Sequence, residues 1–183
     1  MIFKNKHFTE DEIKGKDFED GVFTSCSFAG VLFKFSNFLA CQFNACDFSG
    51  SFFELVNFSD CTFSESKLSF LDFSGTKIQA CNFSKSIMVQ CIFQQRKKCD
   101  LKNCVFEGTE LSRSAFVFCD LTAVSFKAAN LEHVVFERCQ LHNTNFTEAN
   151  IAGANFENSI IKNTILDMGG FVQFGNSKGF VLE

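Results

Sequence analysis

The sequence predicts an all-β solenoid, a chain wound into a coil whose sides are each five residues long. Every fifth residue is large and apolar, the residue two positions before it is usually small, and the 183 residues include 28 Phe but no Tyr, Trp or Pro. A period of five fits neither the 3.6-residue repeat of a helix nor the two-residue repeat of a strand. Each unit is therefore predicted to form one short side with its large residue directed at the axis. Phe suits that position because its ring has no polar group to be satisfied.

The large residues form two series with the same period. The first series is Phe8, Ile13, Phe18, Phe23, Phe28, Phe33, Phe38, Phe43, Phe48, Phe53, Phe58, Phe63, Leu68, Phe73, Ile78, Phe83, Met88 and Phe93. The phase then shifts by three residues, and the second series is Leu101, Phe106, Leu111, Phe116, Leu121, Phe126, Leu131, Phe136, Leu141, Phe146, Ile151, Phe156, Ile161 and Leu166. We assign residues 18–166 to the coil, with a register shift at 94–100.

All ten cysteines occupy the small position of the repeat. They are Cys26, Cys41, Cys46, Cys61, Cys81, Cys91, Cys99, Cys104, Cys119 and Cys139. A metal or redox ladder is one interpretation, but parallel inward side chains lack the tetrahedral convergence that zinc requires. We interpret the thiols as small, moderately apolar filling residues that are reduced, and we expect neither a metal site nor a cofactor.

Several repeats carry a recognisable signature. Ala129-Asn130-Leu131, Ala149-Asn150-Ile151 and Ala154-Asn155-Phe156 resemble the A-(D/N)-(L/F)-x-x motif of the pentapeptide-repeat family, and the resemblance covers about residues 18 to 166. It implies a right-handed quadrilateral β-helix with four repeats per coil and about eight coils. Phe alternates with Leu or Ile in the second series from Leu101 to Ile161, which is the pattern expected when Phe occupies two opposite sides of a four-sided coil.

Both ends depart from the repeat. Residues 1–17 keep the period but have Lys6, Asp11 and Lys16 at the small position, so we expect an N-terminal cap of imperfect repeats that blocks the open edge of the coil. Residues 167–183 lose the repeat and show no helical periodicity. We expect short extended segments around a Gly-Asn turn there. They either cap the core or contact a second copy through Phe171, Phe174 and Phe180.

Nothing in the sequence points to catalysis. His7, His133 and His142 are far apart with no activated nucleophile near them, and the glycines form no phosphate-binding loop. A net charge of −4 argues against direct binding of nucleic acid. The chain starts at Met1 with no leader or long apolar run, so we expect a cytoplasmic protein that does not enter a membrane. Arg96, Lys97 and Lys98 form a basic cluster that is either a loop contacting a partner or a solvated corner.

Two functional hypotheses remain, and the favoured one is an interaction or scaffold rod that binds proteins and self-associates, as a dimer. One side of the coil carries large apolar residues at outward positions, which is unusual for a soluble monomer. The predicted interaction surface consists of Leu32, Phe35, Phe52, Leu55, Ile92, Val117, Phe118 and Val135. A dimer could form side by side through this surface or end to end through the C-terminal segment.

The alternative is a DNA mimic that protects or modulates a bacterial type II topoisomerase, DNA gyrase or topoisomerase IV. The segments from His7 through Phe18 and from Phe23 to Phe28 resemble the start of the quinolone-resistance members of the family. Mimicry of DNA needs an ordered negative field, yet the outward charges are mixed on every side. That subgroup also resembles rods with longer projecting loops and a C-terminal helical dimer element, and neither is expected from this sequence.

Overall fold

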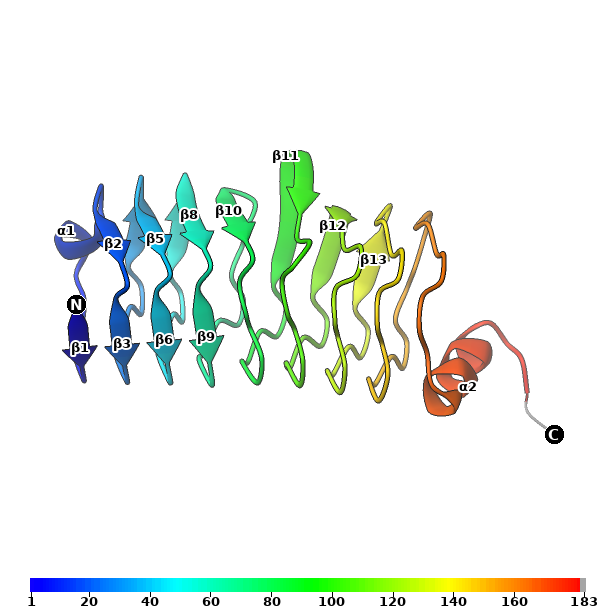
Figure 1. Ribbon diagram of the computed structural model, residues 1–183. Coiled ribbons are helices and arrows are strands. Elements are labelled where there is room, and N and C mark those ends of the chain that lie inside the picture. Colours follow the sequence, from blue (N-terminus) through cyan, green and yellow to red (C-terminus); the bar gives the residue numbers. More distant parts are fainter. Residues whose placement is uncertain (182–183) are drawn as a thin grey trace.

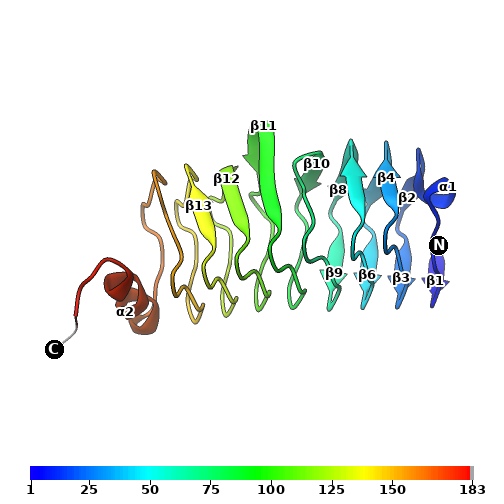
Figure 2. The same cartoon turned by 180° about the vertical axis from the view of Figure 1, so that it is seen from behind.

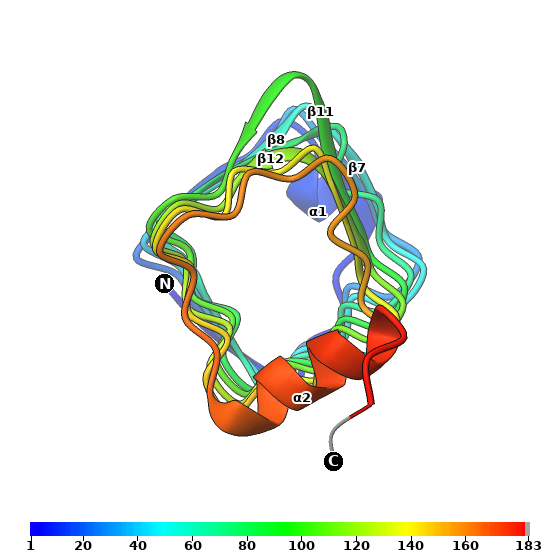
Figure 3. The ribbon, with the colours of Figure 1, turned by 90° about the vertical axis from the view of Figure 1, so that its right-hand side faces the viewer.

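The chain forms a four-sided rod. The computed structural model describes residues 1–181, apart from the side chains of residues 96–98. Successive coils stack along the rod in Figures 1 and 2, and the view along the axis in Figure 3 shows four sides that superpose from coil to coil. The all-β quadrilateral solenoid predicted from the repeat is therefore confirmed.

Parallel strands from successive coils pair on three of the four sides. Face 1 contains β1 (Ile2–Lys4), β3 (Val22–Thr24), β6 (Gln42–Asn44) and β9 (Thr62–Ser64). Face 3 contains β4 (Leu32–Lys34), β7 (Phe52–Glu54), β11 (Ile92–Asp100), β12 (Ala115–Asp120) and β13 (Val135–Glu137). Face 4 contains β2 (Asp17–Glu19), β5 (Asn37–Leu39), β8 (Val56–Ser59) and β10 (Thr76–Gln79). Helices α1 (Glu10–Ile13) and α2 (Met168–Ser177) lie at the two ends.

Face 2 is held by single bridges, and these count the turns. Seven successive parallel bridges connect His7, Ser27, Asp47, Lys67, Ile87, Glu110, Asn130 and Asn150. The eight bridged residues mark eight levels along the rod, which we call rungs, and seven full turns of the chain separate the first rung from the last. This number agrees with the about eight coils expected from the sequence.

The large residue of each repeat points to the axis, as predicted. On face 1 the rings of Phe3, Phe23, Phe43, Phe63, Phe83, Phe106, Phe126 and Phe146 form one stacked column with centroids 4.8–5.3 Å apart. Phe3 belongs to this column although the predicted series began at Phe8. Ile161 is an exception because its side chain is 53% exposed. No further coil covers it, and α2 runs along a different side of the last coil (Figure 3).

The small position has a second role that the sequence did not indicate. The Cys61 thiol donates to the Phe38 carbonyl at 3.4 Å and the Ser36 hydroxyl donates to the Ile13 carbonyl at 2.7 Å, each bond spanning 23 residues. A small residue with a hydrogen-bond donor thus satisfies a carbonyl of the preceding coil while it fills space. Thr76 departs from the pattern, because its buried hydroxyl has no hydrogen-bond partner among the described residues.

The coil is distorted next to Thr76, around Gly75 and Phe53. A Cβ on Gly75 would lie only 2.8 Å from the Phe53 carbonyl oxygen, so this backbone approach requires glycine. The Phe53 ring is only half-buried, and it meets Phe33 edge-on at 5.1 Å instead of stacking. The column of rings on face 3 is therefore interrupted at this rung.

The first coil is modified around a short helix. Thr9 and Glu12 form a capping box at the start of α1, which replaces the strand of face 3 in this coil. Lys6 is at a small position, yet its ammonium lies 4.7 Å from the centre of the Phe8 ring and 2.8 Å from a carboxylate oxygen of Glu12. The stem of Lys6 thereby covers part of the open end.

The prediction of extended segments at the C-terminus is wrong, because α2 is a ten-residue helix. Asp167 caps it by accepting a hydrogen bond from the Gly170 amide at 2.8 Å. The Phe174 ring packs edge-on against Phe156 at 5.9 Å, and the Gln173 side chain accepts from the Ile151 amide at 2.7 Å. Docking on the last coil outweighs the poor helix propensity of the glycines in this segment.

Candidate interaction surface

Large apolar residues lie along face 3 and its corner with face 4. We call this set the apolar side, and its members are Leu32, Phe35, Phe52, Leu55, Ile92, Val117, Phe118 and Val135. Phe52 is 67% exposed, Leu55 62% and Phe35 51%. Ile92 and Phe118 are also exposed, whereas Leu32, Val117 and Val135 are half-buried. All eight predicted outward positions thus reach the surface of one side.

The corners of the coil impose a backbone conformation that large residues disfavour. The second residue after most of the large inward residues lies in the left-handed region, and 24 non-glycine residues there have φ between 49° and 64°. Asn, Asp and Gly tolerate this region. Three large residues of the apolar side adopt this conformation, namely Phe35 (φ 55°), Leu55 (φ 53°) and Phe118 (φ 54°). Phe70 (φ 64°) adopts it on the adjoining corner. A residue with a Cβ adopts this conformation at a cost of about 1–2 kcal/mol.

Charged side chains flank the apolar residues at both ends. Near the N-terminal end, the Lys34 ammonium lies 2.8 Å from Glu54 and 5.2 Å from the centre of the Phe35 ring. Near the C-terminal end, the Arg138 guanidinium lies 5.1 Å from the centre of the Phe118 ring. Both ends of the apolar side therefore place a cation over an exposed ring.

A groove of about 790 Å³ interrupts the apolar side where the coil is distorted. Its lining includes Phe53, Leu55, Gly75, Thr76 and Gln95. Beside it the backbone of β11 projects beyond the neighbouring coils (Figure 3), because the register shift between Gln94 and Cys99 is absorbed at this corner. The side chains of Arg96, Lys97 and Lys98, predicted as a loop contact, lie outside the described residues.

The C-terminal end has apolar residues of its own. Phe171 is 65% exposed and Phe180 73% exposed, whereas Phe174 is partly buried against the last coil. The predicted set of three thus divides into one core contact and two surface residues. Ile160, Ile161 and Ile165 are also about half exposed on the last coil. Their position in the final repeats was the signal that could have identified them.

The pentapeptide-repeat models match the chain in two segments. The repeat-region model covers residues 86–166 and the model of eight tandem repeats covers residues 57–95, so together they span more than half of the sequence. The chain belongs to the pentapeptide-repeat family. No curated protein matches it.

Two solved structures show the same fold. A trypsin-treated form of QnrB1, a plasmid-mediated fluoroquinolone resistance protein, aligns with a TM-score of 0.67 at 18% identity and covers 100% of this chain and 99% of its own. HetL, a pentapeptide-repeat protein involved in heterocyst differentiation regulation in the cyanobacterium Nostoc sp. strain PCC 7120, aligns with a TM-score of 0.61 at 12% identity. That alignment covers 92% of this chain and 88% of HetL.

The cysteines of this pentapeptide-repeat chain are free and buried. Burial raises the pKa of the Cys91 and Cys104 thiols to about 12, so both are neutral at pH 7. A neutral thiol is neither a nucleophile nor a good metal ligand. Among the described residues, no group of three or more His, Cys, Asp or Glu side chains is placed to hold a metal ion.

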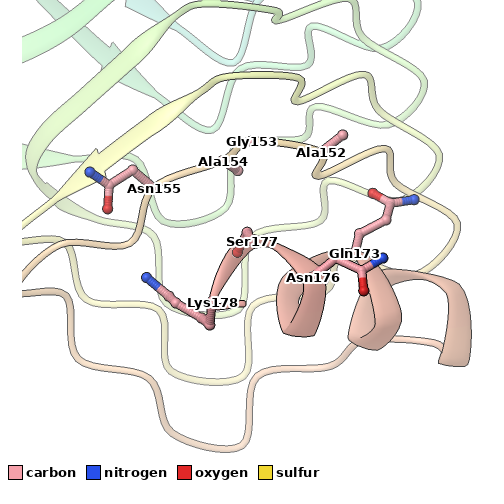
Figure 4. Close-up of a pocket in the computed structure, with 8 residues that line it drawn as sticks. All are labelled: Ala152, Gly153, Ala154, Asn155, Gln173, Asn176, Ser177 and Lys178. Atoms are coloured by element: carbon pink, nitrogen blue, oxygen red, sulfur yellow. The ribbon is translucent and has the colours of Figure 1, made fainter. Parts of the chain in front are cut away.

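A pocket of about 540 Å³ lies between α2 and the last coils of the pentapeptide repeat (Figure 4). Its eight lining residues are Ala152, Gly153, Ala154, Asn155, Gln173, Asn176, Ser177 and Lys178. Gln173 already uses its side-chain oxygen to hold α2 on the coil. The lining offers no acid–base pair, and we assign the pocket to helix docking. Within residues 1–181, no helix combines the length and the apolar character needed to cross a membrane.

Proposed function

We propose that this pentapeptide-repeat protein is a non-enzymatic interaction rod that contacts other proteins, and further copies of itself, through the apolar side. One observation carries the proposal. Phe35, Leu55 and Phe118, together with Phe70 on the adjoining corner, are large apolar residues that are exposed while they occupy left-handed corners.

Each of these residues destabilises an isolated rod in two ways, through its backbone conformation and through its exposed apolar side chain. The corner conformation costs about 1–2 kcal/mol per residue, and the exposed side chain keeps its apolar area in water. Covering that area would return on the order of 25 cal/mol for each Å² removed from water. Left-handed corners occur on every side of the rod, so the exposed apolar area is what distinguishes these four residues. A partner with an apolar contact surface is the simplest occupant.

The test replaces Phe35, Phe52 and Phe118 together with Lys and follows molecular mass by light scattering at tens of micromolar. The unmodified protein is expected to associate and the triple variant to be monomeric. The matched control replaces three exposed corner residues of face 1 with Lys, namely Ala45, Glu65 and Ala128. Association that survives in the triple variant, or that is lost equally in the control, would contradict the assignment to the apolar side.

The rival contact is end to end, through the exposed Phe171 and Phe180. Deleting residues 171–183 distinguishes it, because this truncation should abolish an end-to-end dimer and preserve one made through the apolar side. Circular dichroism of the truncated protein must first verify that the last coil stays folded.

The second candidate is modulation of DNA gyrase or topoisomerase IV. Two observations favour it: the likeness in fold to QnrB1, and α2, which removes the supposed lack of a C-terminal helix. The charge distribution argues against this candidate, because mimicry of DNA needs an ordered negative field. Face 4 begins with Asp17, Glu19 and Asp20 but continues with Lys77 and Lys102. A gyrase supercoiling assay with and without a quinolone tests it. Protection or inhibition at micromolar protein supports this candidate, and unchanged supercoiling refutes it.

A further inference from the structure

We infer that two copies of this chain pair side by side in antiparallel orientation, with the twofold axis crossing face 3 midway between the rungs of Phe73 and Phe93. The inference rests on the proposed function and specifies the partner and the contact register.

Face 3 has eight rungs with regular spacing. Their inward residues are Ile13, Phe33, Phe53, Phe73, Phe93, Phe116, Phe136 and Phe156. Parallel pairing sets the rungs about 4.8 Å apart. The coils superpose along the rod in Figure 3, so the face stays on one side throughout. A twofold axis in the plane of contact and perpendicular to the rod reverses the order of rungs but keeps the position within each strand. An axis at the midpoint therefore pairs the second rung with the seventh, and the third with the sixth.

This register brings apolar residues together. Leu32 lies opposite the partner's Val135, and Leu55 lies opposite the partner's Phe118. Phe52 lies opposite the partner's Ala115. The exposed residues of the third rung, which are among the most exposed on the apolar side, are thus covered by the sixth rung of the partner.

The same register pairs opposite charges at both ends of the contact. Lys34 faces the partner's Glu137, and Arg138 faces the partner's Phe35. Glu54 meets the partner's Val117 and keeps its own ion pair with Lys34. Among the described side chains of rungs two to seven, no two like charges stand opposite each other.

Neighbouring registers do not share this property. An axis on the Phe73 rung places Asp72 directly against the partner's Asp72. An axis on the Phe93 rung places Glu54 against the partner's Glu137. An axis parallel to the rod sets Lys34 against Leu32 and Glu137 against Val135 of the partner subunit, so the opposite-charge pair of the midpoint register is lost. Complementarity selects the midpoint.

The projecting backbone of β11 also has a defined position in this register. The projecting corner of β11 belongs to the fifth rung and therefore lies opposite the fourth rung of the partner, where Gly75 has no side chain and the groove opens.

The contact area indicates a reversible dimer. Seven spacings of about 4.8 Å give a length of about 34 Å, and five residues at about 3.3 Å give a width of about 16 Å. Two such faces bury on the order of 1,000 Å² in total, near the lower limit for a specific interface. Dissociation on dilution is the expected behaviour.

Cross-linking tests the register directly. Leu32→Cys and Val135→Cys are made separately and treated with a bismaleimide that spans about 10 Å, the usual separation of two packed sheets. The native thiols are buried and will not compete. A mixture of the two variants should form a covalent dimer, whereas either variant alone should not, because like positions lie five rungs or about 24 Å apart along the rods. Cross-linking of a single variant, or none in the mixture, would overturn the inference.

Charge reversal gives an independent test by sedimentation equilibrium. Lys34→Glu and Glu137→Lys should each weaken the dimer at least tenfold, and an equimolar mixture should recover most of the affinity because every facing pair is again opposite in sign. Lys127→Glu on face 1 is the matched control and should leave the affinity unchanged. Failure of the mixture to recover would refute the register.

The outcomes separate this inference from the proposed function. An unmodified protein that is monomeric at tens of micromolar overturns the twofold dimer, but it leaves the apolar side for a different protein. A dimer that persists when Phe35, Phe52 and Phe118 are all Lys overturns both.

Discussion

Phe126 provides a stringent test of the inward register. Its side chain is fully buried in the middle of the second half of the rod. The ring stacks on Phe106 at 5.2 Å and on Phe146 at 5.3 Å, and it meets Phe116 and Phe136 edge-on at 5.6 and 5.7 Å. Phe126→Ala removes contacts with the coils above and below it and leaves a cavity that the stacked backbones cannot close.

The expected loss in the free energy of unfolding is about 3–5 kcal/mol, the usual range for a buried Phe replaced by Ala. Phe126→Asn should lose more, because it adds an amide that cannot be satisfied there, at about 1–3 kcal/mol. The matched control is Phe118→Ala, the same change at an exposed corner, where the free energy of unfolding should change by less than about 0.5 kcal/mol.

Urea denaturation followed by circular dichroism measures these changes. Because each coil contacts only its neighbours, a weakened coil is also expected to uncouple the two halves and broaden the transition. The inward assignment would be refuted if Phe126→Ala and Phe118→Ala lost similar free energies, or if either Phe126 variant melted within a degree or two of the unmodified protein.

Four further predictions concern the thiols, the corners and the C-terminal helix. Burial raises the pKa of Cys91 to about 12, and unfolding returns this pKa to its ordinary value. The contribution of the Cys91 thiol to the free energy of unfolding is therefore complete below about pH 9, and it is lost as the pH rises towards 12. Cys91→Ser, which keeps a donor, should reduce the fall of the unfolding free energy over that range. Cys61→Ala should fold with a modest loss of stability, and a chelator should leave its melting temperature unchanged; stoichiometric bound zinc would contradict this. Phe70→Asn should raise the free energy of unfolding by about 1 kcal/mol, measured in urea, since Asn tolerates the left-handed corner; a loss would show that the ring makes a stabilising contact. Asp167→Ala should expose the Glu148 amide, which now donates to the Asp167 carboxylate at 2.6 Å, to faster hydrogen exchange; unchanged exchange would show that α2 docks without its cap.

The core of this fold was predictable because a single rule repeats. The large apolar residue at every fifth position faces inward. This rule holds from Phe18 to Ile151, with Phe53 as a half-buried exception. The rule depends on coils above and below, and it fails at Ile161, where the next coil is missing. α2 was missed because its helix is stabilised by docking against Phe156 rather than by propensity.

The candidate surface was only partly predictable for a related reason. Outward positions follow from the period, so the exposure of Phe52 and Leu55 could be expected. The left-handed conformation of Leu55 could not, because it arises from the geometry of the corner. The groove at Gly75 arises from a backbone approach that leaves no pattern in the sequence.

The columns of rings also make the protein its own optical probe. With no Tyr or Trp in the chain, its aromatic near-ultraviolet circular dichroism comes from phenylalanine, and most of these rings are locked in stacks between coils. Such signals vanish when fixed packing is lost even if the backbone stays folded. A single Trp placed on any coil would be spectroscopically unique, so the opening of individual coils could be followed without background.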